Sequence, residues 1–226
     1  MPIFQLVEEI IFPKPEFAEP DGLLAIGGDL KPERLLGAYT NGIFPWFSEG
    51  DPILWWSPDP RTVIMLEDFK VSKSLLQSIK KYSYEIKFDS NFSEVIKQCA
   101  LVERKHEDGT WITKEMIKAY TELHKLGFAH SVEVYFEGKL VGGLYGISLG
   151  NAFFGESMFH IKTDASKAAI YFLVEKLKVW NYSFVDAQIR TEHLISLGAK
   201  EIKRIDYLKL LENSMKAETR IGSWNE

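Results

Sequence analysis

Three apolar runs of strand length follow one another from residue 129 to residue 160, and a helical run comes directly after them. HSVEVYF and KLVGGLYGISLG are joined by Glu137-Gly138, which predicts a hairpin, and NAFFGESMF predicts a third strand. Residues 165–179 predict a helix, because apolar residues recur there at helical spacing, as at Leu173 and Leu177. A helix after antiparallel strands packs on their apolar face, so this order restricts the chain to α+β or three-layer architectures.

The amino-acid composition and the spacing of apolar residues change near residue 61. Residues 1–61 are rich in Pro, Gly and aromatics, and their one clear helix begins near Pro32 and ends at Asn41-Gly42. The runs IFPWF and ILWWSPDPR that follow predict short strands and ordered loops. We therefore expect a small N-terminal domain over 1–61 and a larger domain over 62–226. The other elements expected in the larger domain are strands at Val63–Leu66, FVDAQI and Ile202–Tyr207, and helices at Ser72–Lys81, Phe92–Val102, Thr113–Leu126 and His193–Leu197.

Composition and missing motifs exclude several classes of protein. No stretch approaches the length of apolar sequence that spans a bilayer, and no signal-peptide pattern opens the chain, so we expect a cytoplasmic protein without a membrane partner. Cys99 is the only cysteine, which excludes an intrachain disulfide and a thiolate metal cluster. Dinucleotide-binding, P-loop, zincin and hydrolase-elbow motifs are all missing, so no cofactor and no metal are expected. The histidines lack metal-ligand spacing and are interpreted as surface or hydrogen-bonded residues; they are His106, His124, His130, His160 and His193.

Charge is distributed unevenly along the chain. The formal net charge is −5, yet residues 70–118 contain ten Lys and Arg against seven Asp and Glu. Composition alone favours a solvated helical face for this segment, while a nucleic-acid contact would use its local positive field. The candidates for contact with nucleic-acid phosphates are Lys73, Lys80, Lys81, Arg104 and Lys105.

Polar residues interrupt two of the apolar strands. In FVDAQI, strand alternation puts Phe184, Asp186 and Gln188 on one face. A carboxylate and an amide are costly there if they are buried without partners, although Asp186 could instead cap a helix or accept from backbone donors. Glu156-Ser157 in FFGESMF is the second interruption, and two such interruptions on strands that flank one helix indicate a shared site.

Four tryptophans are a third candidate signal. Trp46, Trp55, Trp56 and Trp111 could each offer a stacking surface for a nucleic-acid base, worth roughly 1–3 kcal/mol per base. Taken singly, a place in the core is the better explanation for each of them.

Nine sequence blocks, taken in order, carry a resemblance to one family. They are GLLAIGGDLKPERLLGAYTNGIFPWF, DPILWWSPDPR, GTWIT, LHKLGFAHSVEV, LVGGLYG, FFGESMF, ASKAA, DAQ and HLISLGA. In this order they resemble the leucyl/phenylalanyl-tRNA–protein transferase family over nearly the whole chain. The segment after Tyr207 matches no pattern of that family.

The resemblance implies a small N-terminal α/β domain followed by an N-acetyltransferase-like (GNAT-like) catalytic domain. It implies a monomer that transfers Leu or Phe, and Met less well, from aminoacyl-tRNA to acceptor proteins with N-terminal Arg or Lys. This modification marks proteins for degradation in the bacterial N-degron pathway.

The resemblance also implies roles for individual residues. Trp46, Trp111 and Ser157 are implied to bind the aminoacyl-adenosine end of the tRNA. Glu156, Asp186 and Gln188 are implied to surround the reacting groups and the basic acceptor residue. Leu144 stands where methionine is also found, which should change the pocket shape only slightly. The amino-acid side-chain pocket is implied to contain Leu144, Phe153, Met158, Ile170 and Leu173.

The expected reaction needs alignment more than acid–base power. Its donor is an activated ester, its nucleophile is an amine with an ordinary pKa near 7.7–8.0, and orientation can contribute about 7–11 kcal/mol. We expect Gln188 to accept a hydrogen bond from the amine, Asp186 to polarise Gln188, and Glu156 to serve as a counter-charge for the acceptor.

Two other functions fit parts of the sequence. An acyl-CoA-dependent N-acyltransferase would use a glycine-rich turn before the helix, and HIKTDASKAA has no glycine there. A non-catalytic RNA- or peptide-binding module would explain the tryptophans but gives no reason for polar residues inside apolar strands.

Overall fold

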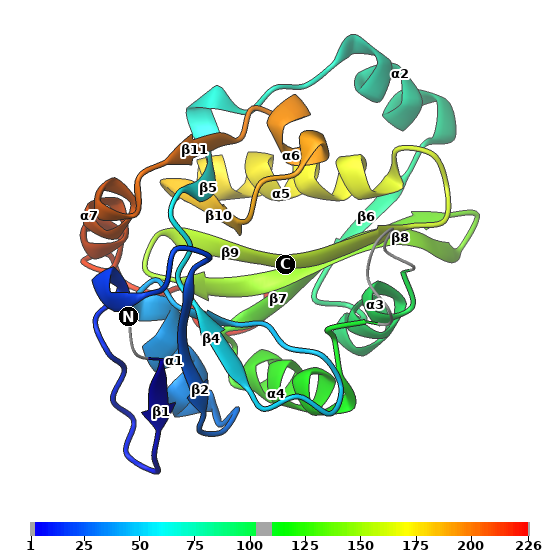
Figure 1. Ribbon diagram of the computed structural model, residues 1–226. Coiled ribbons are helices and arrows are strands. Elements are labelled where there is room, and N and C mark those ends of the chain that lie inside the picture. Colours follow the sequence, from blue (N-terminus) through cyan, green and yellow to red (C-terminus); the bar gives the residue numbers. More distant parts are fainter. Residues whose placement is uncertain (1–2, 103–109, 226) are drawn as a thin grey trace.

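The computed structural model describes residues 3–102 and 110–225, which form two β-sheets with helices packed around them (Figure 1). The smaller sheet comes from the first part of the chain and has the strand order β1-β2-β4-β3. Helix α1 (Pro32–Thr40) begins at a proline, whose fixed φ suits a first turn, and Gly42 follows it with a φ of +74°. The strands are β1 (Phe4–Leu6), β2 (Leu23–Gly27), β3 (Phe44–Pro45) and β4 (Leu54–Trp56).

The larger sheet has the strand order β11-β5-β10-β9-β8-β7-β6. Over the described ranges, β9 and β10 are its one parallel pair, and every other neighbouring pair is antiparallel. Helix α5 (Ala165–Val179) makes the crossover between β9 and β10. This confirms the α+β class and the N-acetyltransferase-like second part. The strands are β5 (Arg61–Met65), β6 (Glu85–Phe88), β7 (Ala129–Phe136), β8 (Lys139–Leu149), β9 (Ala152–His160), β10 (Phe184–Gln188) and β11 (Lys200–Ile202).

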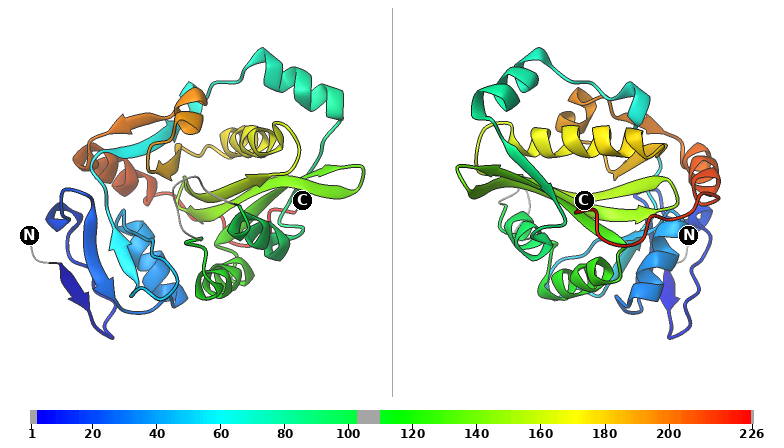
Figure 2. Two further views of the ribbon diagram at one scale, coloured as in Figure 1. Left: turned by 45° about the vertical axis from the view of Figure 1, so that its right-hand side comes forward. Right: turned by 180° about the vertical axis from the view of Figure 1, so that it is seen from behind.

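Helices cover both faces of the larger sheet. Helix α5 lies on one face, while α3 and α4 lie on the other, next to the small sheet and α1 (Figure 2). No helix in the described ranges is both long and apolar enough to cross a bilayer. The remaining helices are α2 (Lys73–Tyr82), α3 (Phe92–Ala100), α4 (Lys114–Lys125), α6 (Glu192–Ser196) and α7 (Arg204–Ser214), with short 3₁₀ turns at Pro15–Phe17 and Leu66–Asp68.

Alternation along the strands produces two hydrophobic cores. Leu144 of β8 and Phe153 of β9 face the core under α5, whereas Tyr145 and Phe154 face the core shared with α1, α3 and α4. Strands buried on both faces read as nearly continuous apolar runs, which is why β8 and β9 are so apolar in sequence.

Sequence-based element assignments are confirmed in the middle of the chain and wrong after residue 202. Ser72 and Thr113 each accept a capping hydrogen bond from a backbone amide three residues on, at the start of α2 and α4. The predicted strand Ile202–Tyr207 is wrong, because β11 ends at Ile202 and α7 begins at Arg204. Tyr207 and Leu211 are buried one helical turn apart, and this spacing outweighs the short alternation that precedes it.

The larger sheet splits between β9 and β10. Their pairing runs from Phe184 opposite Ala152 to Asp186 opposite Phe154, and it stops there. Beyond this point β9 continues to His160, while β10 ends at Gln188, where a bulge breaks the register with β5. The two strand ends therefore diverge, and each presents side chains to the space between them.

Candidate active site

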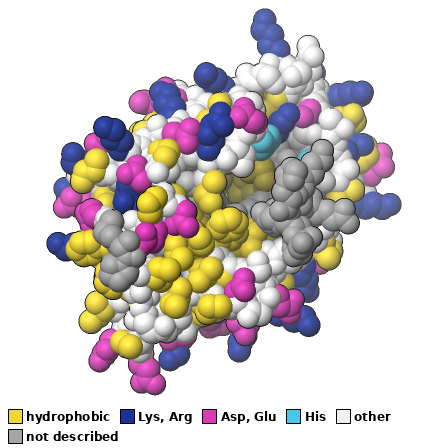
Figure 3. Space-filling view, in the orientation of Figure 1, with side chains coloured by type: hydrophobic (Ala, Val, Ile, Leu, Met, Phe, Trp, Pro, Cys, Tyr) yellow, Lys and Arg dark blue, Asp and Glu magenta, His cyan; other side chains and the backbone are white. Residues whose placement is uncertain are grey.

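A cavity of about 390 Å³ opens where β9 and β10 diverge. In the space-filling view it is a hollow in the centre of the face, with hydrophobic side chains around it (Figure 3). Its lining combines residues of β3, β8, β9, α5, β10 and α6 with residues of the adjoining loops, including the loop before α4: Phe44, Pro45, Trp46, Trp111, Leu144, Tyr145, Phe153, Gly155, Glu156, Ser157, Met158, Ile170, Leu173, Val185, Ala187, Gln188, Ile189, Thr191, His193 and Leu194.

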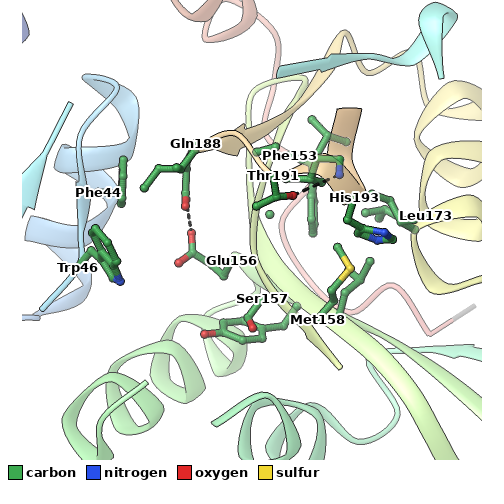
Figure 4. A pocket seen from close by; sticks show the side chains of 18 of the residues that line it. Phe44, Trp46, Phe153, Glu156, Ser157, Met158, Leu173, Gln188, Thr191 and His193 are labelled. Atoms are coloured by element: carbon green, nitrogen blue, oxygen red, sulfur yellow. Dashed lines mark hydrogen bonds between the residues drawn. The ribbon is translucent and has the colours of Figure 1, made fainter. Parts of the chain in front are cut away.

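Ten residues singled out from the sequence meet in this cavity. All five members of the expected side-chain pocket line it, and their apolar side chains lie on the side of α5. Trp46 and Trp111 line it as half-buried indoles, and Ser157 lies between the two groups (Figure 4). Glu156 and Gln188 complete the set, so the cavity joins an apolar pocket to a polar pair.

The polar pair is part of a larger hydrogen-bonded group. The Gln188 amide donates to Oε1 of Glu156 over 2.9 Å, as drawn in Figure 4. The hydroxyl of Tyr39 in α1 donates to the same oxygen over 2.7 Å, and that of Tyr120 in α4 donates to Oε2 over 3.0 Å. The two tyrosine hydroxyls also contact each other. Glu156 is therefore held by three donors from three different elements.

Burial changes the pKa values of Glu156 and of the two tyrosines bound to it. Burial raises the pKa of Glu156 to about 7, although its three hydrogen bonds favour the ionised form, and the negative charge of Asp186 adds to the rise. Burial and the Glu156 charge raise the pKa values of Tyr39 and Tyr120 well above the ordinary value, so both hydroxyls remain donors. A carboxylate with a pKa near neutrality can take up or release a proton at cellular pH.

Asp186 lies behind the cavity and does not line it. It is fully buried, and Arg61 binds it at two points, with Nε 2.9 Å from Oδ1 and Nη2 2.7 Å from Oδ2. Tyr207 donates to Oδ2 over 2.7 Å, and the backbone amide of Gln188 donates to Oδ1 over 3.0 Å. The expectation that Asp186 and Gln188 project together is wrong. A bulge separates them, and Gln188 has a φ of +60°.

Asp186 thus fixes the backbone from which Gln188 projects. A left-handed φ is unfavourable for a non-glycine residue, and the hydrogen bond from its amide to Asp186 offsets that cost. Strict strand alternation would have placed Val185, Ala187 and Ile189 opposite Gln188, yet all four line the cavity.

Several site residues were missed in the sequence. Tyr39 and Tyr120 are fully buried on helices, and the only available signal was that a buried tyrosine hydroxyl needs a hydrogen-bond partner. Arg61 is fully buried at the start of the apolar strand β5, and an arginine cannot remain buried there without a partner. His193 also lines the cavity, where burial lowers its pKa.

The candidate phosphate-binding residues lie elsewhere. Lys73, Lys80 and Lys81 are exposed on α2, whereas Arg104 and Lys105 lie outside the described residues. Within the part of the chain that the structure describes, no three His, Cys, Asp or Glu side chains group as a metal site would require.

Sequence relatives cover nearly the whole chain. It is 58% identical to the leucyl/phenylalanyl-tRNA–protein transferase of Thermodesulfovibrio yellowstonii, over 100% of this chain and 92% of that protein. It is 55% identical to the protein of the same name in Syntrophotalea carbinolica, over 95% and 93% of the two chains. Among solved structures, L-PGS from Bacillus licheniformis is similar at 14% identity and a TM-score of 0.42, over 76% of this chain and 57% of that one.

Two family models match, and together they cover most of the chain. The model for the leucyl/phenylalanyl-tRNA protein transferase matches residues 63–212, and the model for the N-terminal domain of the same proteins matches residues 28–59. These matches favour the transferase over an acyl-CoA-dependent enzyme or a non-catalytic binding module. The chain belongs to the leucyl/phenylalanyl-tRNA–protein transferase family of aminoacyltransferases.

Proposed function

We propose that this protein transfers Leu or Phe, and Met less well, from aminoacyl-tRNA to the N-terminal Arg or Lys of acceptor proteins. The observation that carries the proposal is the single cavity in which an apolar pocket opens directly beside the Glu156–Gln188 pair. An amino-acid side chain bound in the pocket would bring its ester carbon to these polar groups.

In the proposed complex, aromatic side chains bind the terminal adenosine of the aminoacyl-tRNA. Trp46 and Trp111 lie at the cavity wall and offer indole faces to the terminal adenine, with Ser157 between them and the apolar pocket. The backbone carbonyl of Trp46 accepts a hydrogen bond from the indole N–H of Trp56 over 2.7 Å, and the two indole rings pack with their centroids 5.6 Å apart. A fixed platform lowers the entropy lost when the adenine binds.

Pocket shape explains the choice of amino acid. The side chains of Leu144, Phe153, Ile170 and Leu173 are apolar, so a polar side chain packed against them would lose its hydration without gaining a hydrogen bond from them. An apolar cavity discriminates by size at only about 1–3 kcal/mol per methylene, which suits an enzyme that accepts Leu, Phe and Met. Met158 can adapt its flexible side chain to each of them.

In the proposed reaction, the acceptor nitrogen attacks the ester carbon, a C–N bond forms and the ester C–O bond breaks. The Gln188 amide group donates to Glu156, which leaves its carbonyl oxygen to accept from the attacking amine. Glu156, whose pKa is about 7, accepts the proton that the amine loses and returns it to the ribose oxygen that leaves. Tyr39 and Tyr120 hold the Glu156 carboxylate for this exchange.

The proposed reaction gives Asp186 and Glu156 roles that differ from those expected from the sequence. Asp186 acts on the reaction by positioning Gln188, since it contacts the Gln188 backbone and the Arg61 guanidinium. Glu156 takes the acid–base role, because it lines the cavity and has the perturbed pKa.

The acceptor and the rest of the tRNA are matched by charge. Residues 1–61 carry ten Asp and Glu against four Lys and Arg, and two of those four, Arg34 and Arg61, are fully buried. This negative field next to the cavity favours an acceptor that begins with Arg or Lys. On α2, Lys73, Lys80 and Lys81 are proposed to contact tRNA phosphates, with Arg104 and Lys105 as further candidates.

The remaining parts of the proposal concern the whole protein. We propose a cytoplasmic monomer with a small domain over 1–61 and a catalytic domain over 62–226, whose product is marked for degradation.

The test is transfer from radiolabelled Leu-, Phe- and Val-tRNA to a peptide that begins with Arg, beside a matched peptide that begins with Asp. Label is expected on the Arg peptide from Leu- and Phe-tRNA, little from Val-tRNA, and none on the Asp peptide. Folded protein that transfers no label, or that labels both peptides equally, would overturn the proposal.

A further inference from the structure

The segment after α7, residues 215–225 and here named the strap, crosses the back of the molecule toward the larger sheet. Figure 2 shows it in red, running from α7 to the position marked C. Backbone contacts anchor it along this path: the amide of Gly150 donates to Thr219 over 2.8 Å, and the amide of Gly222 donates to the carbonyl of Gly127 over 3.1 Å. The strap is thus bound to the loops at the ends of β7 and β8.

Trp224 ends this path in a fully enclosed position. Only 2% of its surface is exposed, and its ring stacks on His130 at 3.8 Å between centroids and 9° between planes. Trp180 packs edge-on against it at 5.0 Å. Its backbone is fixed on both sides, because its amide donates to Asp89 over 2.7 Å and its carbonyl accepts from Lys176 over 3.0 Å.

The same indole contacts a wall of the amino-acid pocket. The rings of Trp224 and Phe153 lie 5.8 Å apart at 42°, and Phe153 lines the cavity. Glycine at position 146 makes room for the Phe153 ring, because a Cβ there would lie 2.6 Å from two ring carbons. Phe153 is therefore confined between the backbone of β8, the cavity and Trp224.

We propose that Trp224 is a positioning residue that sets the depth of the amino-acid pocket through Phe153. Tight packing means that the Phe153 ring cannot withdraw while the indole is in place. A smaller side chain at 224 leaves space behind Phe153, the ring moves back, and the pocket deepens. The consequence is a change in preference between donor side chains of different length. This inference rests on the proposed function, since it takes the cavity to be the pocket for the transferred amino acid.

The test compares binding of two stable donor analogues, leucyl-adenosine and phenylalanyl-adenosine joined by an amide in place of the ester. Calorimetry gives a Kd for each, and their ratio does not depend on the fraction of folded protein. Trp224→Leu is expected to shift the ratio toward phenylalanyl-adenosine by about threefold or more, a size effect below that of one methylene. Trp224→Phe, which keeps an aromatic plane behind Phe153, is expected to restore a ratio within about twofold of wild type.

A matched control variant distinguishes a change in pocket depth from a general loss of core packing as the cause of a shifted Kd ratio. Leu211 of α7 is 1% exposed and does not line the cavity, so Leu211→Val is expected to lower stability without changing the ratio. An unchanged ratio in Trp224→Leu, or an equal change in Leu211→Val, would overturn the inference. Should Trp224→Leu fail to fold, Trp224→Met takes its place, with the same expectation.

Transfer from Leu- and Phe-tRNA to an Arg peptide is measured with the same proteins. If wild type transfers normally and Trp224→Leu keeps the wild-type Kd ratio, the inference about Trp224 is contradicted and the proposed function is not. Wild type that transfers nothing, while the Kd ratio shifts in Trp224→Leu, contradicts the proposed function and leaves the inference supported.

Discussion

The side-chain amide of Gln188 donates a hydrogen bond of 2.9 Å to Glu156, a residue 32 positions earlier on the neighbouring strand. The two side chains meet because β9 and β10 pair only as far as Phe154 and Asp186 and then diverge. The distance between the strand ends is bridged by these side chains instead of by backbone hydrogen bonds. Substitutions at this contact and around it therefore give measurable and separable effects.

Glu156→Gln is expected to lower kcat/KM for transfer by about 10²–10⁴-fold, because a glutamine cannot take up the proton of the amine. Wild-type kcat/KM is expected to fall as the pH drops through about 7, where Glu156 becomes protonated. The variant should lose this part of the pH profile and keep only the titration of the acceptor amine. Transfer to the Arg peptide between pH 5.5 and 9 measures both effects, and a variant profile identical in shape to wild type would argue against the role.

The same substitution is expected to change how stability depends on pH. The pKa of Glu156 is raised from 4.5 to about 7 on folding, so the folded protein binds this proton more tightly than the unfolded chain does. Its contribution to stability is complete below pH 4.5 and is lost as the pH rises through about 7. Urea unfolding measures the free energy of unfolding at pH 5 and at pH 8. The decrease in this free energy from pH 5 to pH 8 should be smaller in Glu156→Gln than in wild type, by about 2 kcal/mol. Equal losses in the two proteins would contradict the raised pKa.

Asp186→Asn is expected to cost about 3–5 kcal/mol of unfolding free energy, because it leaves the fully buried Arg61 without a counter-charge. The double variant Arg61→Met with Asp186→Leu removes both charges and is expected to recover most of that loss. Its transfer activity should remain low, because the backbone of Gln188 has lost its acceptor. Recovery of activity together with stability would show that Asp186 does not position Gln188.

Leu173→Trp is expected to reduce transfer of Phe more than transfer of Leu, because the added ring volume fills the pocket from the side of α5. A tenfold change in the Phe:Leu ratio of kcat/KM corresponds to about 1.4 kcal/mol, which is within the range for pocket size effects. Tyr171→Trp on the same helix is the control, since Tyr171 does not line the cavity. Similar ratios in both variants would place the side-chain pocket elsewhere.

Replacing Lys73, Lys80 and Lys81 together by Gln is expected to weaken tRNA binding at low salt and to flatten its salt dependence. Each phosphate contact contributes about 0.7–0.9 to the slope of log K against log[salt], so three contacts would reduce the slope by about 2. Filter binding at several salt concentrations measures this. A slope equal to that of wild type would assign the three lysines to a solvated face of α2.

The sequence predicted the elements that have strong local signals. The hairpin at Glu137-Gly138 and the helix over 165–179 are confirmed, since their turn residues and helical spacing leave few alternatives. The strand β6 (Glu85–Phe88) was not predicted, because a short edge strand alternates polar and apolar residues over only four positions. Helix α7 was missed because its first turn contains the same alternation as a strand.

Many residues of the candidate site could be predicted from the sequence, but how they are arranged around the cavity could not. Glu156 and Gln188 stand out in sequence because they interrupt apolar strands, and both line the cavity. The role of Asp186 could not be read in this way, since its partner Arg61 lies 125 positions away and a bulge overrides the alternation of β10. Pairings of this kind depend on tertiary contacts that leave no local pattern.

The hydrogen bond from Tyr39 to Glu156 spans 117 positions and connects helix α1 to strand β9, which bears the Glu156 carboxylate. Phe44, Pro45 and Trp46 add a wall of the cavity from the same part of the chain. A fragment that begins at residue 62 would therefore have an open-sided cleft and a Glu156 carboxylate short of one donor, and it would also lack Arg61, the ion-pair partner of Asp186. Neither of the two family-matched regions holds a complete site, because Tyr39 and Trp46 lie within residues 28–59 whereas Glu156 and Gln188 lie within residues 63–212.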